Sequence, residues 1–219
     1  RLRDLRAAEP AMLVEALANR RRRELLGGDG RLFIVAADHP ARGALAVGTN
    51  PAAMADRYEL IERLAVALGR PGVDGVLGTA DIIDDLAGLG LLDDKIVLGS
   101  MNRGGLRGAA FEMDDRMTAY DVPAMISAGV DVAKTLVRIN LADSAAVSTL
   151  ESVAAAVTAA AAARLPIMLE PFMSRWVDGR IVNDLSTDAV ILSIAITSGL
   201  GASSAYTWMK LPVVEDMDG

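Results

Sequence analysis

Three lysines are the first residues of this chain to suggest chemistry, because lysine is otherwise scarce. Only Lys95, Lys134 and Lys210 occur, against nineteen arginines. Lys134 lies within the apolar run 130-VDVAKTLVRI-139, and Lys210 lies within 205-AYTWMKLPVV-214. Burying an unpaired ammonium group is costly in free energy. Both positions therefore predict a specific use for the amine.

A buried lysine has such a use in carbonyl chemistry. Burial disfavours the charged form and lowers the pKa of the amine. A neutral amine attacks a carbonyl and forms a Schiff base, whose protonated imine withdraws electrons and permits cleavage of a neighbouring carbon–carbon bond. A second cation nearby, such as Lys134 or Arg138, would lower the pKa of Lys210 further. The alternative is a lysine whose stem packs at the rim of the fold while its amine reaches water or a carboxylate.

Glu170 is the candidate for proton transfer. It lies in the apolar stretch 168-MLEPF-172, and a carboxyl group in that setting is expected to have a raised pKa, which suits a group that accepts and returns protons. Its alternative role is charge balance for Lys134 or Lys210, and the two roles are compatible.

Further polar residues follow other apolar runs. Asp38 and His39 occur in 36-AADHPARG-43, and Asn102 and Arg103 occur in 99-GSMNRGG-105. Asp38 could hold a substrate hydroxyl or orient a lysine. Asn102 and Arg103 could bind polar substrate groups or belong to an ordinary glycine-rich loop. His39 is the only histidine, and it could contact substrate or simply pack in a turn.

Trp208 and Lys210 are two residues apart in one predicted strand, so their side chains share a face. Trp208 therefore either lines the pocket or packs the core.

Six short apolar runs and the helical patterns between them must position these residues. The predicted strands are residues 32–37, 73–78, 95–99, 130–139, 166–172 and 205–214. Helical patterns cover residues 8–25, 51–69, 79–87, 144–164 and 186–199. Alternation of strands and helices indicates parallel strands with helices outside, and strands that are apolar on both faces agree with that arrangement.

Two α/β architectures fit this alternation, a doubly wound open sheet and a (β/α)8 TIM barrel. No G-x-G-x-x-G sequence follows the first strand, so nothing supports a dinucleotide-binding fold. Five strands send polar groups to one end or to the interior, as a closed barrel does at its active-site face. We therefore predict one (β/α)8-barrel domain over residues 1–219, with an N-terminal helix and about six βα units. A full barrel has about 250 residues, so we expect its last units outside this chain.

Composition limits the function classes. The net charge is −7 and the calculated pI is about 4.8, which argues against nucleic-acid binding. We interpret the basic run Arg20–Arg23 as a solvated helix end. The chain has no cysteine, so it has no disulfide or zinc ribbon. It has neither an apolar run of about 18 residues nor the apolar core of a signal peptide at its start. We therefore expect a cytoplasmic protein without membrane partners, and the acidic, alanine-rich helices suit a homo-oligomer.

The order Asp38-His39, Lys134, Glu170, Lys210 resembles the class I aldolases, in the superfamily of the deoxyribose-phosphate and tagatose-bisphosphate aldolases. The stretches 35-VAADHPARGAL-45, 99-GSMNRGG-105 and 203-SSAYTWMKLPVV-214 are similar to an actinobacterial (β/α)8 group linked to inositol catabolism. The resemblance covers essentially the whole chain. One departure is His39-Pro40, where relatives often carry glycine or glutamine.

This resemblance implies roles for the residues already named. Lys210 would form the Schiff base, Glu170 would transfer protons and Lys134 would assist. Asp38 would complete the catalytic set. His39, Asn102, Arg103, Arg138 and Trp208 would contact a sugar-phosphate-like substrate, which in an inositol pathway could be a phosphorylated deoxy-keto-gluconate. No cofactor is implied.

Two other functions fit the same residues. The first is a lyase that uses Mg²⁺ held by carboxylates such as Asp38 and Glu170, since Mg²⁺ needs only one or two protein carboxylates. One histidine and no cysteine argue against zinc, and our main prediction includes no metal site. The second is a non-catalytic protein that binds sugar phosphates.

Overall fold

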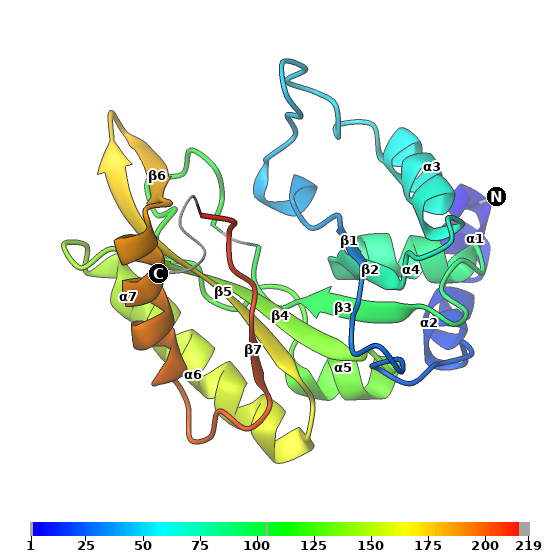
Figure 1. Cartoon of the computed structure of the whole chain (residues 1–219). Coiled ribbons are helices and arrows are strands. Elements are labelled where there is room, and N and C mark those ends of the chain that lie inside the picture. The colour runs from blue at the N-terminus through cyan, green and yellow to red at the C-terminus, as the bar shows by residue number, and fades with distance from the viewer. Residues whose placement is uncertain (1, 104, 215–219) are drawn as a thin grey trace. The chain divides into compact units, whose positions relative to one another are not determined.

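The computed structural model describes residues 2–103 and 105–214, which form two compact units of mixed helices and strands (Figure 1). The first unit comprises Arg1–Ser100 and Pro123–Val132, and the second comprises Met101–Val122 and Ala133–Gly219. Gly104 and residues 215–219 are part of the predicted domain but lie outside the described residues.

Three parallel strands organise the first unit. β1 (Ile34–Ala36) pairs with β2 (Gly75–Gly78), and β2 pairs with β3 (Ile96–Ser100). The parallel pairing predicted from the strand–helix alternation is therefore confirmed here. The helices of this unit are α1 (Leu2–Ala8), α2 (Ala11–Ala18), a 3-10 helix at Pro40–Arg42, α3 (Arg57–Leu68), α4 (Ala80–Gly88) and α5 (Val122–Ala128).

The core of the first unit lies around β2 and β3, whose residues are all buried. α4 contributes Ile82, Ile83 and Leu86 to this core. Gly75 is required in β2, because a Cβ atom at this position would collide with the backbone of Ile96 on the paired strand. Glycine therefore permits the close approach of the two strands.

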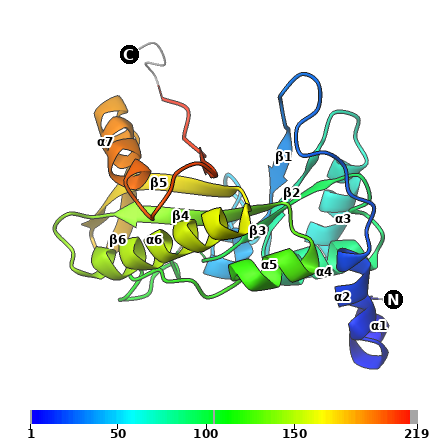
Figure 2. The same ribbon diagram turned by 90° about the horizontal axis from the view of Figure 1, so that it is seen from below.

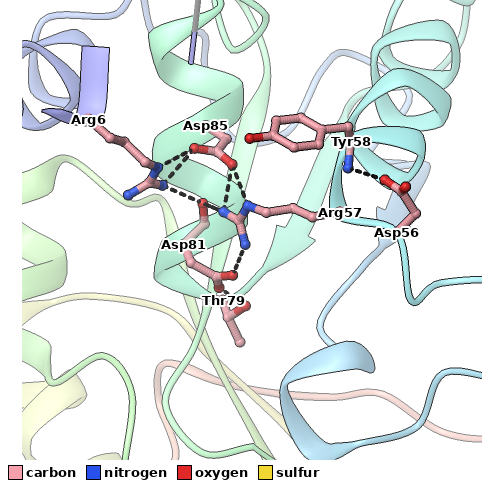
Figure 3. A network of polar contacts seen from close by, with 7 residues as sticks. All are labelled: Arg6, Asp56, Arg57, Tyr58, Thr79, Asp81 and Asp85. Carbon is pink, nitrogen blue, oxygen red and sulfur yellow. Dashed lines mark hydrogen bonds and ion pairs between the residues drawn. The ribbon is translucent and has the colours of Figure 1, made fainter. Parts of the chain in front are cut away.

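A polar network joins three helices of the first unit (Figure 3). Asp85 of α4 is buried, and its carboxylate accepts hydrogen bonds from Arg6 of α1 at 2.6 Å and from Arg57 of α3 at 2.7 Å. Arg57 also binds Asp81, one turn earlier on α4. Asp56 caps the start of α3 by accepting from the backbone N–H of Tyr58. The predicted helix over residues 51–69 therefore begins later than expected, at Arg57.

The basic run Arg20–Arg23 is not a solvated helix end, because the helix predicted over residues 8–25 ends early. α2 covers only Ala11–Ala18 of that range, α1 ends where the predicted helix was to begin, and the arginines follow α2 in a segment without regular secondary structure. Arg20 is buried, and its Nη2 lies 2.6 Å from Oδ2 of Asp131. Arg22 binds the other oxygen of Asp131 at 2.6 Å. The buried carboxylate of Asp131 determines where this segment runs.

The second unit is built around β5 (Ile167–Val177). β4 (Val132–Ile139) and β7 (Thr207–Met209) both pair in parallel with the first part of β5, on opposite edges. β6 (Arg180–Asp184) pairs antiparallel with the last part of β5. The helices are α6 (Ala145–Ala163), which runs beside β4 and β5 in Figure 2, and α7 (Thr187–Ser198), which packs on β5.

The β5–β6 hairpin is an element that the sequence prediction missed. β5 continues to Val177, five residues beyond its predicted end, and β6 returns after a two-residue turn at Asp178 and Gly179. Both turn residues have positive φ angles, 48° and 72°. An Asp-Gly pair between two strands is a strong hairpin signal for this reason, so the information was present in the sequence.

The two helices of the second unit begin close to where they were predicted. Ser186 caps α7 by accepting from the N–H of Ala189, as expected. α6 has the length and apolar composition of a membrane span, but it buries one face at the spacing of a core helix. That face consists of Ala146, Thr149, Val153, Ala156, Val157 and Ala160. α6 is therefore a layer of the folded unit and not a clear membrane span.

Candidate functional site

One face of the sheet in the second unit carries the ionisable side chains. In the β4–β5 register, Leu136 lies opposite Glu170 and Arg138 lies opposite Phe172. Side chains alternate between faces along a strand, so Lys134 and Arg138 share a face with Glu170. Trp208 of β7 lies opposite Met168 of β5 and points to this same face.

Lys134, Glu170 and Lys210 form a chain of two ion pairs on this face. Oε2 of Glu170 lies 2.7 Å from Nζ of Lys134, and Oε1 lies 2.6 Å from Nζ of Lys210. The exposed fractions of the side chains are 4% for Lys134, 14% for Glu170 and 33% for Lys210. The three residues predicted to act together are therefore in direct contact.

The pKa of Glu170 differs from the prediction. Burial acts to raise this pKa, but the positive charges of Lys134 and Lys210 and their hydrogen bonds outweigh burial, so the pKa is lowered. The expected rise in an apolar setting is thus wrong, because two lysines contact the carboxylate at once and their combined effect on its pKa exceeds that of burial. Glu170 is ionised at neutral pH and can only accept a proton there.

Lys210 lies at the edge of the site and not in the middle of a buried strand. β7 ends at Met209, although the backbone N–H of Lys210 still donates to the carbonyl of Leu169 at 2.8 Å. This bond holds the start of the lysine side chain against β5, while the remainder is partly exposed. Lys210 therefore combines a fixed backbone with an accessible amine.

A second buried ion pair lies further along β4. Nη1 of Arg138 is 2.8 Å from Oε1 of Glu112, and both side chains are almost fully buried. Glu112 belongs to an irregular segment over residues 101–103 and 105–121, and its Oε2 accepts a hydrogen bond from the N–H of Gly108 at 2.8 Å. The irregular segment is therefore fastened to the sheet face through Arg138.

Asp115, in the same segment, is a buried acid beside these cations. Its exposed fraction is 6%. Burial raises its pKa to about 6, against the opposing effects of a hydrogen bond from Gly105 and the charges of Arg138, Lys134 and Arg103. Asp115 therefore exchanges its proton close to neutral pH.

The backbone around Asp115 is held on both sides. Its N–H donates to Oγ1 of Thr149 on α6 at 2.8 Å, and its carbonyl accepts from Nδ2 of Asn102 at 3.3 Å. The Asn102 amide also bonds to both backbone groups of Leu136, at 2.9 Å and 2.8 Å. Asn102 thus links β4 to the irregular segment, and these bonds favour a positioning role for it.

The other two predicted contacts of the second unit are less enclosed. Arg103 is partly exposed, and its Nε donates to Oγ1 of Thr118 at 3.2 Å. Trp208 is half-buried on the lysine face. Whether either residue contacts a substrate stays a prediction.

Asp38 and His39 belong to the first unit, directly after β1. Asp38 is buried, and its Oδ2 accepts a hydrogen bond from Oγ of Ser100 at 3.3 Å. His39 is partly exposed, with Nδ1 3.7 Å from Oδ1 of Asp38, and it starts the 3-10 helix. Their predicted roles toward a substrate stay predictions.

Glu112 and Asp115 are the functional candidates that sequence reasoning missed. They occur in 111-FEMDDR-116, inside a stretch without helical or strand periodicity. The available signal was a group of acidic residues between a glycine-rich segment and an apolar strand that carries Lys134 and Arg138. No group of three histidine, cysteine, aspartate or glutamate side chains suited to a metal ion occurs within residues 2–103 and 105–214.

Comparison with known proteins places these features in a family. The model of the Cgl0159-like family matches residues 30–219. Cgl0159 from Corynebacterium glutamicum, whose crystal structure is known, is 74% identical in sequence to this chain, and its structure has a TM-score of 0.97. The match covers 99% of this chain and 73% of that chain. No protein with a curated function matches at a significant level.

More distant solved structures are aldolases. A Schiff-base-forming fructose-1,6-bisphosphate aldolase is 20% identical with a TM-score of 0.51, over 87% of this chain and 68% of that chain. An archaeal fructose-1,6-bisphosphate aldolase, solved with its catalytic lysine bound to a carbinolamine intermediate, is 20% identical to this chain and has a TM-score of 0.52. The match covers 84% of this chain and 65% of that chain. At this identity the likeness concerns the fold alone, a mixed α/β fold similar to aldolase barrels.

Proposed function

The chain belongs to the Cgl0159-like family, and we propose that it is a class I aldolase, a lyase that forms a Schiff base. The reaction would cleave or form a carbon–carbon bond in a sugar-phosphate-like substrate. The observation that carries the proposal is the Glu170 carboxylate bound between Lys134 and Lys210. The fold likeness to Schiff-base aldolases supports it.

The charges of the three residues show which proton the proposed reaction removes first. Two ammonium groups share the single carboxylate of Glu170, so the group carries one excess positive charge when all three are ionised. Loss of one proton leaves one ammonium, one carboxylate and one neutral amine, and the neutral amine is the nucleophile that a Schiff base requires.

Accessibility assigns the two lysines different roles. Lys210 is one third exposed and lies after the end of its strand, whereas Lys134 is 4% exposed within β4. A carbonyl compound can approach Lys210 more readily. We therefore assign Lys210 as the nucleophile and Lys134 as the fixed cation that holds Glu170 ionised.

Glu170 would move the protons of the reaction. Attack of the neutral Lys210 amine on a carbonyl gives a carbinolamine, and uptake of one proton, equal to the one that the lysine released beforehand, with loss of water gives the protonated imine. During cleavage a base removes a hydroxyl proton, the carbon–carbon bond breaks, and its electron pair moves into the imine to form an enamine. Glu170 begins ionised because its pKa is lowered, so it can accept that proton and later return it.

The remaining predicted features complete this proposal. The whole protein would be a (β/α)8 barrel, with Asp38 as a further catalytic residue and substrate contacts from His39, Asn102, Arg103, Arg138 and Trp208. It would act in the cytoplasm, as a homo-oligomer, in carbohydrate or inositol catabolism. The Mg²⁺-dependent alternative is less favoured, because both oxygens of Glu170 already bind lysines.

Borohydride trapping tests the proposal directly. The full chain would be incubated with dihydroxyacetone phosphate or fructose 1,6-bisphosphate, reduced with borohydride, digested and examined by mass spectrometry. Lys95, whose amine donates to the carbonyl of Val73 at 2.6 Å, is an internal control in the same chain. We expect an adduct on Lys210 that is lost in Lys210→Met and retained in Lys95→Met.

Other outcomes would change the assignment. An adduct on Lys134 alone would exchange the roles of the two lysines and keep the reaction class. Turnover without any adduct, abolished by a chelator, would support the Mg²⁺-dependent lyase. Binding without adduct or turnover would support a sugar-phosphate-binding protein.

A further inference from the structure

Two buried side chains beside the lysine group hold polar atoms that lack hydrogen-bond partners in the described parts of the chain. Arg138 is 4% exposed; its Nη1 binds Glu112, whereas Nε and Nη2 have no partner there. Oδ2 of Asp115 is likewise buried without a partner. Buried polar atoms are nearly always hydrogen-bonded, so these three atoms point to a bound group.

Gly105 brings the two side chains together. Its backbone N–H donates to the Asp115 carboxyl group, and a Cβ atom on Gly105 would lie 2.6 Å from Nη2 of Arg138. Gly105 has a φ of +75°, a conformation that favours glycine. The absence of a side chain at Gly105 therefore lets its backbone pass close to Nη2 of Arg138 while its N–H reaches Asp115.

Arg138 lies near the proposed nucleophile along the sheet. Arg138 is two residues beyond Leu136, the register partner of Glu170, and two residues of a strand span about 7 Å. Arg138 and Glu170 share a face of the sheet, so a molecule joined to Lys210 can extend toward Arg138. The direction is that of the C-terminal end of β4.

We propose that Arg138 and Asp115 form an oxyanion-binding subsite of the lysine site, which takes a carboxylate or phosphate group of the substrate. Arg138 would donate from Nε and Nη2, as guanidinium groups do toward carboxylates and phosphates. Asp115, when protonated, would donate from Oδ2 to the same anion. The term substrate rests on the proposed aldolase function, whereas the subsite itself does not.

The subsite couples anion binding to a proton. Arg103, Lys134 and Arg138 surround Asp115 with positive charge, and Glu112 partly neutralises Arg138. A bound anion adds negative charge beside Asp115 and favours its protonated form. Anion binding therefore weakens as the pH rises above the range in which Asp115 holds its proton.

The test compares ligands that differ in the anionic group. Isothermal titration would measure dihydroxyacetone phosphate against neutral dihydroxyacetone, and levulinate against neutral 2-butanone, in the full chain. Phosphate preference would appear in the first pair and carboxylate preference in the second. We expect Arg138→Met to weaken the affinity for the preferred anion about 10- to 100-fold and to leave the affinity for the neutral ligands unchanged.

Control variants separate local binding from general charge and from folding. Arg116→Met removes an exposed arginine of the same segment, which pairs only with Asp114 among the described residues, and should not change anion binding. Arg138→Lys keeps the charge without the planar fork and covers the case in which Arg138→Met fails to fold. Asp115→Asn should remove the contribution of Asp115 to the pH dependence of levulinate binding between about pH 6 and 8, where levulinate stays ionised, whereas a phosphate ligand itself changes charge near pH 6.

The same titrations in Lys210→Met separate this proposal from the aldolase function. Anion binding that depends on Arg138 but persists without Lys210 would support the subsite even if no Schiff base forms. Equal loss of affinity in Arg138→Met and Arg116→Met would overturn it. Equal affinities of the unaltered chain for the anionic and the neutral ligand of each pair would also overturn the proposal.

Discussion

Nζ of Lys210 lies 2.6 Å from Oε1 of Glu170. The candidate nucleophile and the candidate proton acceptor are thus in contact, and Lys134 holds the second carboxylate oxygen in place. Groups fixed in this way need little rearrangement when a reaction begins. The lowered pKa of Glu170 depends on both lysines.

Replacing Glu170 with glutamine should impair both activity and stability. Loss of the proton acceptor is expected to reduce the cleavage rate about 10²- to 10⁴-fold. Loss of the buried pair with Lys134 is expected to lower the free energy of unfolding by about 3 kcal/mol. Steady-state kinetics and urea denaturation at pH 7 measure the two effects.

The pH dependence of unfolding provides a check on the Glu170 assignment. Because its folded-state pKa is lowered, its contribution is fully present above the ordinary glutamate pKa of about 4.3 and is lost as the pH falls through the folded-state pKa. The wild-type chain should therefore lose more stability on acidification than Glu170→Gln. Parallel curves for the two proteins would contradict this assignment.

Asp115→Asn should change stability with the opposite sign. The folded-state pKa of Asp115 is raised to about 6, above the ordinary value of about 3.9, so its contribution is present below pH 4 and is lost as the pH rises through 6. This loss amounts to about 3 kcal/mol. Relative to wild type, Asp115→Asn should gain stability between pH 4 and 8, whereas the control Asp114→Asn should not.

Gly105→Ala should destabilise the second unit more than Gly108→Ala. Both glycines have positive φ, +75° and +83°, and a strained backbone costs about 1–3 kcal/mol. A Cβ at Gly105 would also meet Arg138 and the carbonyl of Glu112, whereas nothing lies within 4 Å at Gly108. Chemical denaturation of the two variants separates the contact from the backbone effect, and equal losses would argue against a tight space at Gly105.

Asp131→Ala should strongly destabilise the first unit. Its carboxylate accepts from buried Arg20 and from the N–H of Val97 at 2.8 Å, and removal of one partner of a buried pair costs about 3–5 kcal/mol. Asp94→Asn removes the charge of the exposed pair with Arg21, tolerates the positive φ of this residue, and should have little effect. Thermal denaturation compares the two variants. Similar melting temperatures for the two variants would show that the ion pair between Arg20 and Asp131 is exposed to solvent and not buried.

Local patterns predicted the elements well where apolar periodicity was strong. The strand around Lys134 and the helix capped by Ser186 both occur. Patterns failed where a distant charge decides the path of the chain. Arg20 and Arg22, which follow α2, form ion pairs with Asp131, more than a hundred residues away. The sequence near these arginines does not contain that information.

The candidate site shows the same division. Lys134, Glu170 and Lys210 could be named because charged residues interrupt apolar runs, and they lie in contact. The direction of the Glu170 pKa shift could not be predicted correctly, because it depends on two ion pairs with residues from separate parts of the chain. Glu112 and Asp115 were missed because the sequence around them has neither helical nor strand periodicity. Their irregular segment is positioned instead by contacts with Arg138, Asn102 and Thr149.

The scarcity of lysine has a practical consequence for chemical labelling. Almost all the positive charge of this chain is carried by guanidinium groups, which common acylating reagents leave unmodified. Of the three side-chain amines, Lys134 is enclosed and Lys95 is tied to a backbone carbonyl. An acylating probe would therefore report on Lys95 and Lys210, which peptide mapping separates, and protection of Lys210 alone by an added compound would reveal occupancy of the site without any assay of turnover.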